Sequence, residues 1–311
     1  MTLDVQKVGL LFPGQGAQNA GMGKWLYDTF PAARELFLNA ADILGYDLAA
    51  ICFEGPTEKL NATQFSQPAL FVTGMAAVEG LRERHPELLE KVTCTAGLSL
   101  GEYTAVCFAG GLSFESALRL VQRRGEAMQA AADEVESGMA SVLGLDLETL
   151  TAVCEATRHE DEILQPANLL CPGNIAVSGH LSALSRLEET AKEAGASRVI
   201  PLAVAGAFHT PLMHPAVNGL REALSATPPM DTPLPVYSNV DAHPHQDGSE
   251  MHQLLAEQVT EPVLWEASIR RMIEDGVEGF LELGTGRVLQ GTIKRIERRF
   301  PMDGFGDNPG N

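Results

Sequence analysis

Short apolar runs alternate with stretches of helical spacing along the first part of the chain. Apolar runs at 7–12 and 92–97 predict buried strands, and the spacing at 23–44 and 69–85 predicts helices. This alternation is typical of a parallel sheet with helices on its faces. The same rhythm returns after residue 211. It predicts strands at 234–239 and 279–283, and helices at 211–224, 251–255, 264–275 and from 288 onward.

A different order of elements separates these two parts. It predicts strands at 139–145, 163–170, 174–178 and 198–204, and helices at 147–157 and 181–195. The order βαββαβ is that of a ferredoxin-like unit. We therefore predict a hydrolase-like α/β fold whose large, discontinuous domain comprises 1–135 and 206–300 and is interrupted by an insert at 136–205. Residues 301–311, rich in Gly, Pro and Asp, predict a flexible, frayed tail.

Composition and charge exclude several classes of function. The 22 Lys and Arg against 41 Asp and Glu give a formal net charge of −19, which excludes nucleic-acid binding by bulk charge. The longest apolar runs fall short of the ~18 residues that span a bilayer, so we expect no membrane association. The chain does not open on a secretory signal, and its 5 cysteines show no metal-binding spacing. We expect a cytoplasmic enzyme with reduced thiols and no metal.

The segment 97–101, GLSLG, joins a predicted strand to a helix predicted from residue 102. Strand, Gly-x-Ser-x-Gly and helix is the order of a nucleophile elbow. The glycines are needed because strand and helix approach too closely there for a Cβ, which leaves Ser99 exposed at the helix N-terminus. Free amides and the helix dipole at that end can stabilise an oxyanion. The alternative is a glycine-rich turn whose serine only caps the helix.

A second glycine turn, FPGQGAQ at 12–18, follows the first predicted strand. Its backbone amides face whatever binds at the carboxyl edge of the sheet. Its glycines do not form the GxGxxG of a dinucleotide loop, and Gln15 stands where a second oxyanion donor would serve acyl transfer. A purely structural turn is the alternative.

One arginine falls on the apolar face of a predicted helix. Ser113 is typical of an N-cap for a helix over 114–132, on which Arg124 shares a face with Ala117, Val121 and Met128. A buried guanidinium needs an anion. Two anions fit: an internal carboxylate, or the free carboxylate of a substrate, which arginine binds with two parallel hydrogen bonds.

A serine nucleophile needs a neighbour that removes its proton, and that neighbour is most often histidine. Of the 8 histidines, His209 stands at the end of the last strand of the insert, where the chain re-enters the large domain. We therefore choose His209 as the general base. The alternative is a histidine that is satisfied within the core.

Seven motifs in order along 8–296 carry a resemblance to a known family: FPGQGAQ, GLSLGEY, QRRG, GAFHTPLM, SNVD, EQVTEPVLW and ELGTGRVL. The sequence resembles the malonyl-CoA:acyl carrier protein transacylases of type II fatty-acid synthesis. That resemblance implies the same fold, malonyl transfer from malonyl-CoA to the phosphopantetheine thiol of acyl carrier protein, no cofactor, and a monomer. It implies Ser99 as nucleophile and His209 as base. Its further roles are oxyanion amides at Gln15 and Leu100, a malonyl carboxylate ligand at Arg124, a histidine-orienting carbonyl at Gln258, and substrate contacts at Met128, Phe208 and Asn239.

The sequence departs from the family at two places, and three other functions remain as alternatives. Leu98 stands where relatives often have histidine, and the loop 168–174 lacks their NxNxPGQ pattern. A polyketide synthase acyltransferase would carry the same motifs. A serine esterase or patatin-like lipase would need an Asp or Glu partner for its histidine, and a non-catalytic scaffold would not need Ser99 and His209.

Acyl carrier proteins are acidic as a class, so a chain with a net charge of −19 needs a local basic patch to dock one. We predict two candidates. The first, on the final helix, comprises Lys294, Arg295, Arg298 and Arg299; the second comprises Arg119 and Arg123, on the solvated side of the helix that carries Arg124. The alternative is that these cations pair with the chain's own acids.

Overall fold

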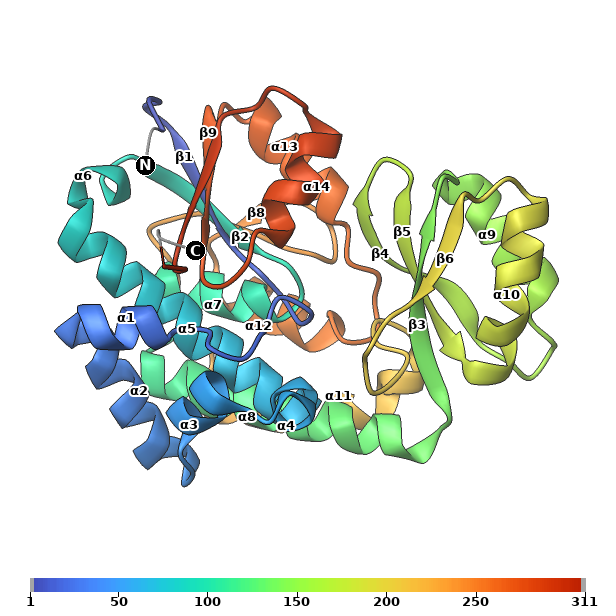
Figure 1. The fold of residues 1–311 in the computed structure, drawn as a ribbon, viewed down its shortest axis with the longest axis horizontal. Helices are drawn as coiled ribbons and strands as arrows, with labels where there is room; N and C mark the ends of the chain where they lie inside the picture. Colours follow the sequence, from blue (N-terminus) through green and yellow to red (C-terminus); the bar gives the residue numbers. More distant parts are fainter. Residues whose placement is uncertain (1–2, 309–311) are drawn as a thin grey trace.

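Two sheets organise the chain in the computed structural model, which describes residues 3–308 (Figure 1). The larger has the strand order β10-β9-β1-β2-β7-β8, with parallel pairing throughout except between β7 and β8. This confirms the α/β class with a parallel sheet. The strands are β1 (Val8–Phe12), β2 (Val92–Gly97), β7 (Val236–Tyr237), β8 (Pro244–His245), β9 (Gly279–Leu283) and β10 (Met302–Phe305).

Helices cover this sheet and bury an extensive apolar core. The long helices α5 and α8 pack together below the strands in Figure 1, and α11 lies against α8. The helices are α1 (Lys24–Thr29), α2 (Pro31–Leu44), α3 (Leu48–Glu54), α4 (Thr57–Asn61), α5 (Thr63–Arg84), α6 (Pro86–Leu89), α7 (Leu100–Phe108), α8 (Phe114–Glu134), α11 (His214–Ala226), α12 (Gly248–Glu257), α13 (Trp265–Glu274) and α14 (Val288–Ile296). Within residues 3–308 no one helix combines the length and apolar character of a membrane span; the bent pair α2 and α3 meets both criteria only jointly.

The single helix expected over 23–44 is two helices. Phe30 is extended, with φ −114° and ψ 115°, and separates α1 from α2. The cause is Pro31, because a residue before proline is driven out of the helical region, while proline itself fits the first turn of the next helix.

The segment between β2 and β7 contains the second, antiparallel sheet, with the order β4-β5-β3-β6. Figure 1 shows it as a separate lobe, with its two helices on the side away from the large sheet. They bury an apolar core of their own against it. The elements are β3 (Ser137–Leu143), α9 (Leu147–Thr157), β4 (Leu164–Cys171), β5 (Asn174–His180), α10 (Leu181–Glu193) and β6 (Arg198–Pro201).

The flexible tail predicted for 301–311 is wrong at 302–305. Met302–Phe305 forms β10, which pairs in parallel with β9 at the edge of the large sheet. Phe305 meets the rings of Trp25 and Phe30, with centroids 5.5 and 6.0 Å away. Burial of one aromatic ring thus outweighs a polar, glycine-rich composition. The last part of the predicted tail, 309–311, lies outside the described residues.

Candidate active site

Ser99 sits in a strained turn between β2 and α7. Its φ of 50° and ψ of −103° are rare for a residue with a side chain, and such strain is concentrated at functional sites. A Cβ on Gly97 would lie 1.9 Å from the carbonyl carbon of Gly101, and one on Gly101 would lie 2.1 Å from the carbonyl oxygen of Phe12. Both glycines are therefore required by close backbone approach, as the elbow interpretation expects.

His209 is in contact with Ser99. Its Nε2 lies 2.9 Å from Ser99 Oγ, and its Nδ1 lies 2.8 Å from the main-chain oxygen of Gln258. A carbonyl can only accept, so Nδ1 carries the proton and Nε2 is the acceptor that faces the serine hydroxyl. The partner of the histidine is thus a carbonyl, where a serine hydrolase of the triad type has a carboxylate.

The protonation state of His209 suits a base. Burial first, and then the positive charge of Arg124, lower the pKa of His209 from 6.5 to about 4. The imidazole is therefore neutral near pH 7 and able to accept the Ser99 proton. The backbone of His209 also has a positive φ of 61°, which makes both members of the pair conformationally unusual.

Arg124 is buried on α8 and points at the serine. Its Nη1 donates to Gln67 Oε1 at 2.7 Å, and its Nη2 donates to Ser99 Oγ and to Gln258 Oε1, both at 2.9 Å. The guanidinium also lies over the ring of Tyr103, 5.0 Å from its centroid. All three hydrogen-bond partners are uncharged.

Arg124 makes no ion pair with a carboxylate among the described residues, although the charge of the buried Glu102 acts on it. None of the ion pairs within residues 3–308 includes this arginine. Its Nε is buried without a hydrogen-bond partner. A buried donor left unpaired is costly, so Nε is the atom of Arg124 at which a further acceptor would be favourable.

The turn after β1 lies directly against the elbow. A Cβ on Gly14 would be 2.3 Å from the carbonyl oxygen of Leu98. The side chain of Gln15 is directed to Thr63, with Nε2 3.4 Å from Oγ1, so it is the main-chain amide of Gln15 that remains for an oxyanion. Leu100 is the first residue of α7, where amides have no partner within the helix. Both predicted oxyanion donors thus belong to adjoining backbone segments.

Asn239 was expected to contact substrate, and in the structure its side chain contacts the backbone on either side of the nucleophile. The residue is fully buried, its Oδ1 accepts from the amide of Ser99 at 2.6 Å, and its Nδ2 donates to the carbonyl of Gly97 at 2.8 Å. Asn239 thus stabilises the backbone of the elbow on both sides of Leu98. Of the other expected substrate contacts, Met128 is 1% exposed, with its sulfur 3.5 Å from Gln67 Nε2, and Phe208 precedes the base at 4% exposed.

Sequence reasoning missed two polar residues of the site, Gln67 and Glu102. Both are buried, at 0% and 2% exposed, within helices that contribute apolar side chains to the core. The available signal was a polar side chain among predicted core positions, because burial without a partner is unfavourable.

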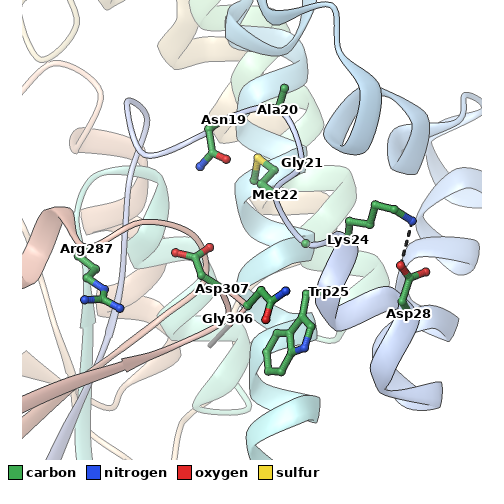
Figure 2. A pocket seen from close by; sticks show the side chains of 12 residues that line it. Asn19, Ala20, Gly21, Met22, Lys24, Trp25, Asp28, Arg287, Gly306 and Asp307 are labelled. Carbon is green, nitrogen blue, oxygen red and sulfur yellow. Dashed lines mark hydrogen bonds and ion pairs between the residues drawn. The ribbon is translucent and has the colours of Figure 1, made fainter. Parts of the chain in front are cut away.

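A separate cavity of about 730 Å³ lies next to the turn that follows β1, and Asn19 to Trp25 line part of it (Figure 2). Lys24 and Asp28 form an ion pair on one side, and Arg287 and Asp307 lie on the other. These charges balance, so the cavity shows no preference for an anion or a cation. It contains none of the residues that surround Ser99, and we assign it no part in the chemistry.

Comparison with known proteins identifies the family to which the chain is similar. Residues 10–299 match the acyl transferase domain family. The chain is 43% identical over 297 residues to the malonyl CoA-acyl carrier protein transacylase of Bacillus subtilis, covering 95% of this chain and 92% of that protein. It also resembles, with a TM-score of 0.92, an acyl-carrier-protein S-malonyltransferase from Bartonella henselae, at 37% identity over 97% of this chain and 96% of that one. A malonyl-transacylase solved with a type II PKS acyl-carrier protein gives 0.92 at 36% identity and the same coverage.

Proposed function

The chain belongs to the acyl transferase domain family, and on that premise we propose that it transfers the malonyl group of malonyl-CoA to an acyl carrier protein through an ester on Ser99. The enzyme is an acyltransferase, as its relatives are by name. The observation that carries the proposal for the site is that Ser99 Oγ touches both a neutral histidine and a buried arginine with a free donor. That combination suits a nucleophile that selects an acyl group with a carboxylate.

In the first half-reaction His209 Nε2 takes the proton of Ser99, and Oγ attacks the thioester carbonyl of malonyl-CoA. The carbonyl oxygen becomes an oxyanion, which the main-chain amides of Gln15 and Leu100 stabilise. The carbon–sulfur bond breaks, and the proton on His209 goes to the leaving CoA thiolate. The free Nε of Arg124, with one of its terminal nitrogens, binds the malonyl carboxylate in a bidentate arrangement.

The second half-reaction reverses these roles. The phosphopantetheine thiol of the carrier gives its proton to His209 and attacks the malonyl-serine ester. The carrier thioester forms, and the serine hydroxyl regains its proton from the histidine. No step needs a metal or a further cofactor. Ser99, His209 and Arg124 all come from one chain, which supports a monomer as the working unit.

The carrier serves fatty-acid synthesis in this proposal, while a relative solved with a type II PKS carrier supports the polyketide alternative. A serine esterase is less well supported, because His209 Nδ1 faces a carbonyl and Arg124 offers a donor that a neutral acyl group would leave unused.

All five cysteines are buried free thiols, which supports a reducing compartment such as the cytoplasm.

Intact-protein mass spectrometry after mixing with malonyl-CoA tests the proposal. We expect one malonyl group on the peptide that contains Ser99, and none on Ser99→Ala. His209→Ala should slow labelling by about 10² to 10⁴-fold. Labelling of Ser99→Ala at the wild-type rate would refute the nucleophile, and an unchanged rate in His209→Ala would remove the histidine from the mechanism.

A further inference from the structure

Glu102 has no assigned role, yet it lies at the centre of the hydrogen-bond network behind Ser99. It is 2% exposed, in the first turn of α7. Its Oε2 accepts from Gln258 Nε2 at 2.6 Å and from the main-chain amide of Asn239 at 3.1 Å. Those two residues in turn hold Ser99, so one carboxylate oxygen anchors both supports of the nucleophile.

The contact with Glu102 decides which way the Gln258 amide faces. A carboxylate oxygen that accepts must meet the NH₂ end of the amide. Nε2 then also donates to the carbonyl of Ser99 at 3.0 Å, and Oε1 is left to accept from Arg124 Nη2 at 2.9 Å. With the amide turned over, its NH₂ group would face the donors of Arg124, and both interactions would be lost.

Rotation of this amide would therefore disturb two functions at once. Arg124 Nη2 is the atom that also contacts Ser99 Oγ. The main-chain oxygen of Gln258, which orients His209, does not depend on the amide. Errors in amide orientation should thus affect the acyl-carboxylate contact and the placement of the serine more than the basicity of the histidine.

We propose that Glu102 is a positioning residue for acyl transfer, whose acceptor oxygen fixes the Gln258 amide so that Arg124 is held toward Ser99 and toward the acyl carboxylate. This rests on the proposed function. The role belongs to the acceptor oxygen and not to the charge. Burial raises the pKa of Glu102 to about 7, so the carboxyl group is partly protonated near neutral pH and still offers Oε2 as an acceptor.

Two variants of nearly equal volume separate the acceptor from the charge. Glu102→Gln can place its amide oxygen where Oε2 lies and keep both hydrogen bonds. Glu102→Met removes the acceptor. Glu188→Gln, at an exposed glutamate that pairs with Lys192 on α10, is the matched control. The assay is the kcat/KM of Ser99 acylation by malonyl-CoA and by acetyl-CoA, with thermal melting to confirm folding.

We expect Glu102→Met to lower kcat/KM for malonyl-CoA by about 10- to 100-fold, the loss that small misplacement of reacting groups causes. The loss for acetyl-CoA should be smaller, because acetyl lacks the carboxylate. Glu102→Gln should recover most of both activities, and the control should match wild type. A folded Glu102→Met with wild-type rates and selectivity would overturn the proposal, as would a folded Glu102→Gln that is as impaired as Glu102→Met.

Coupling to Gln258 gives a second, independent readout. Gln258→Met removes the amide and keeps the carbonyl that faces His209. If Glu102 acts through this amide, the malonyl-to-acetyl ratio of the double variant should match that of Gln258→Met alone. If Glu102→Met does not fold, Gln258→Met still decides, since wild-type selectivity there would overturn the proposal. Wild-type labelling by malonyl-CoA is measured first, so that failure of the proposed function is recognised separately.

Discussion

Replacing Arg124 with methionine should remove selectivity for malonyl without removing acyl transfer. The guanidinium brings a free Nε, and its Nη2 now contacts only neutral oxygens. A hydrogen bond to a charged partner is worth about 1.5 to 3 kcal/mol, and a neutral one about 1. Two bonds to a carboxylate, less the neutral bonds they displace, contribute about 3 kcal/mol. The expected loss of kcat/KM for malonyl-CoA relative to acetyl-CoA is therefore about 10²-fold.

The same substitution should shift the pH profile of the reaction. The positive charge of Arg124 is the second cause, after burial, of the lowered pKa of His209. The neutral imidazole is the active form, so activity falls as the pH drops through that pKa. Without the cation the pKa rises from about 4 toward its usual value, and the acid limb of acetyl transfer should move to higher pH.

The assay is serine acylation followed by intact mass at a series of pH values. Arg123→Met is the matched control, because Arg123 is the adjacent residue, is 71% exposed and pairs with Glu126 on the helix surface. Equal losses with malonyl-CoA and acetyl-CoA, together with an unmoved acid limb, would refute the reasoning and leave Arg124 with the sole task of ordering Ser99.

Three further predictions concern stability and the acyl pocket. Burial lowers the pKa of His209 from 6.5, its value in the unfolded chain, to about 4 in the folded protein. Between these pH values the unfolded chain binds more protons, so the free energy of unfolding should rise with pH. In His209→Gln this rise, measured by urea titration, should be smaller by up to roughly 3 kcal/mol. Phe305→Ala should cost about 3 kcal/mol in the same assay, and a cost near zero would contradict the packing of β10. Phe208→Ala should raise turnover of methylmalonyl-CoA relative to malonyl-CoA about tenfold, and an unchanged ratio would remove Phe208 as the barrier to an α-methyl group.

Elements with a strong local signal were predictable from the sequence. The strands at Val92–Gly97 and Gly279–Leu283 and the helix at Leu147–Thr157 have the predicted bounds. The elbow was predictable for the same reason, because GLSLG follows one of these strands directly. The strand β10 was not predictable from the sequence. Its Phe305 packs against the rings of Trp25 and Phe30, which are far away in the sequence.

The residues that position Ser99, His209 and Arg124 could be only partly predicted from the sequence. Gln258 was placed through a resemblance and not through any local pattern. The partners of Arg124 lie 57 and 134 residues away along the chain, at Gln67 and Gln258. Hydrogen-bond networks of this kind form only when distant elements pack, so neither the choice of amide partner nor the role of Glu102 can be derived from periodicity.

The two basic patches predicted to dock the carrier differ in whether their cations have ion-pair partners. Arg119 pairs with Glu115, and Arg123 pairs with Glu126, as the alternative of internal pairing expected. On the other patch α14 ends at Ile296, so Arg298 and Arg299 lie beyond the helix and not on its face. Arg295 donates to the carbonyls of Pro172 and Gly173 in the turn between β4 and β5. No ion pair within residues 3–308 includes Lys294, Arg298 or Arg299.

We therefore expect an acidic carrier to dock on the unpaired, exposed cations at the end of α14. Lys294→Glu with Arg298→Glu should raise the KM for the carrier several-fold at low salt, and the effect should fade as salt screens the charges. Malonylation of Ser99 by malonyl-CoA should not change, because neither residue takes part in the hydrogen bonds around Ser99. Arg119→Glu with Arg123→Glu is the control, since both cations already have partners. A carrier KM that is unchanged at low ionic strength in the first variant would place docking elsewhere on the rim between the lobes.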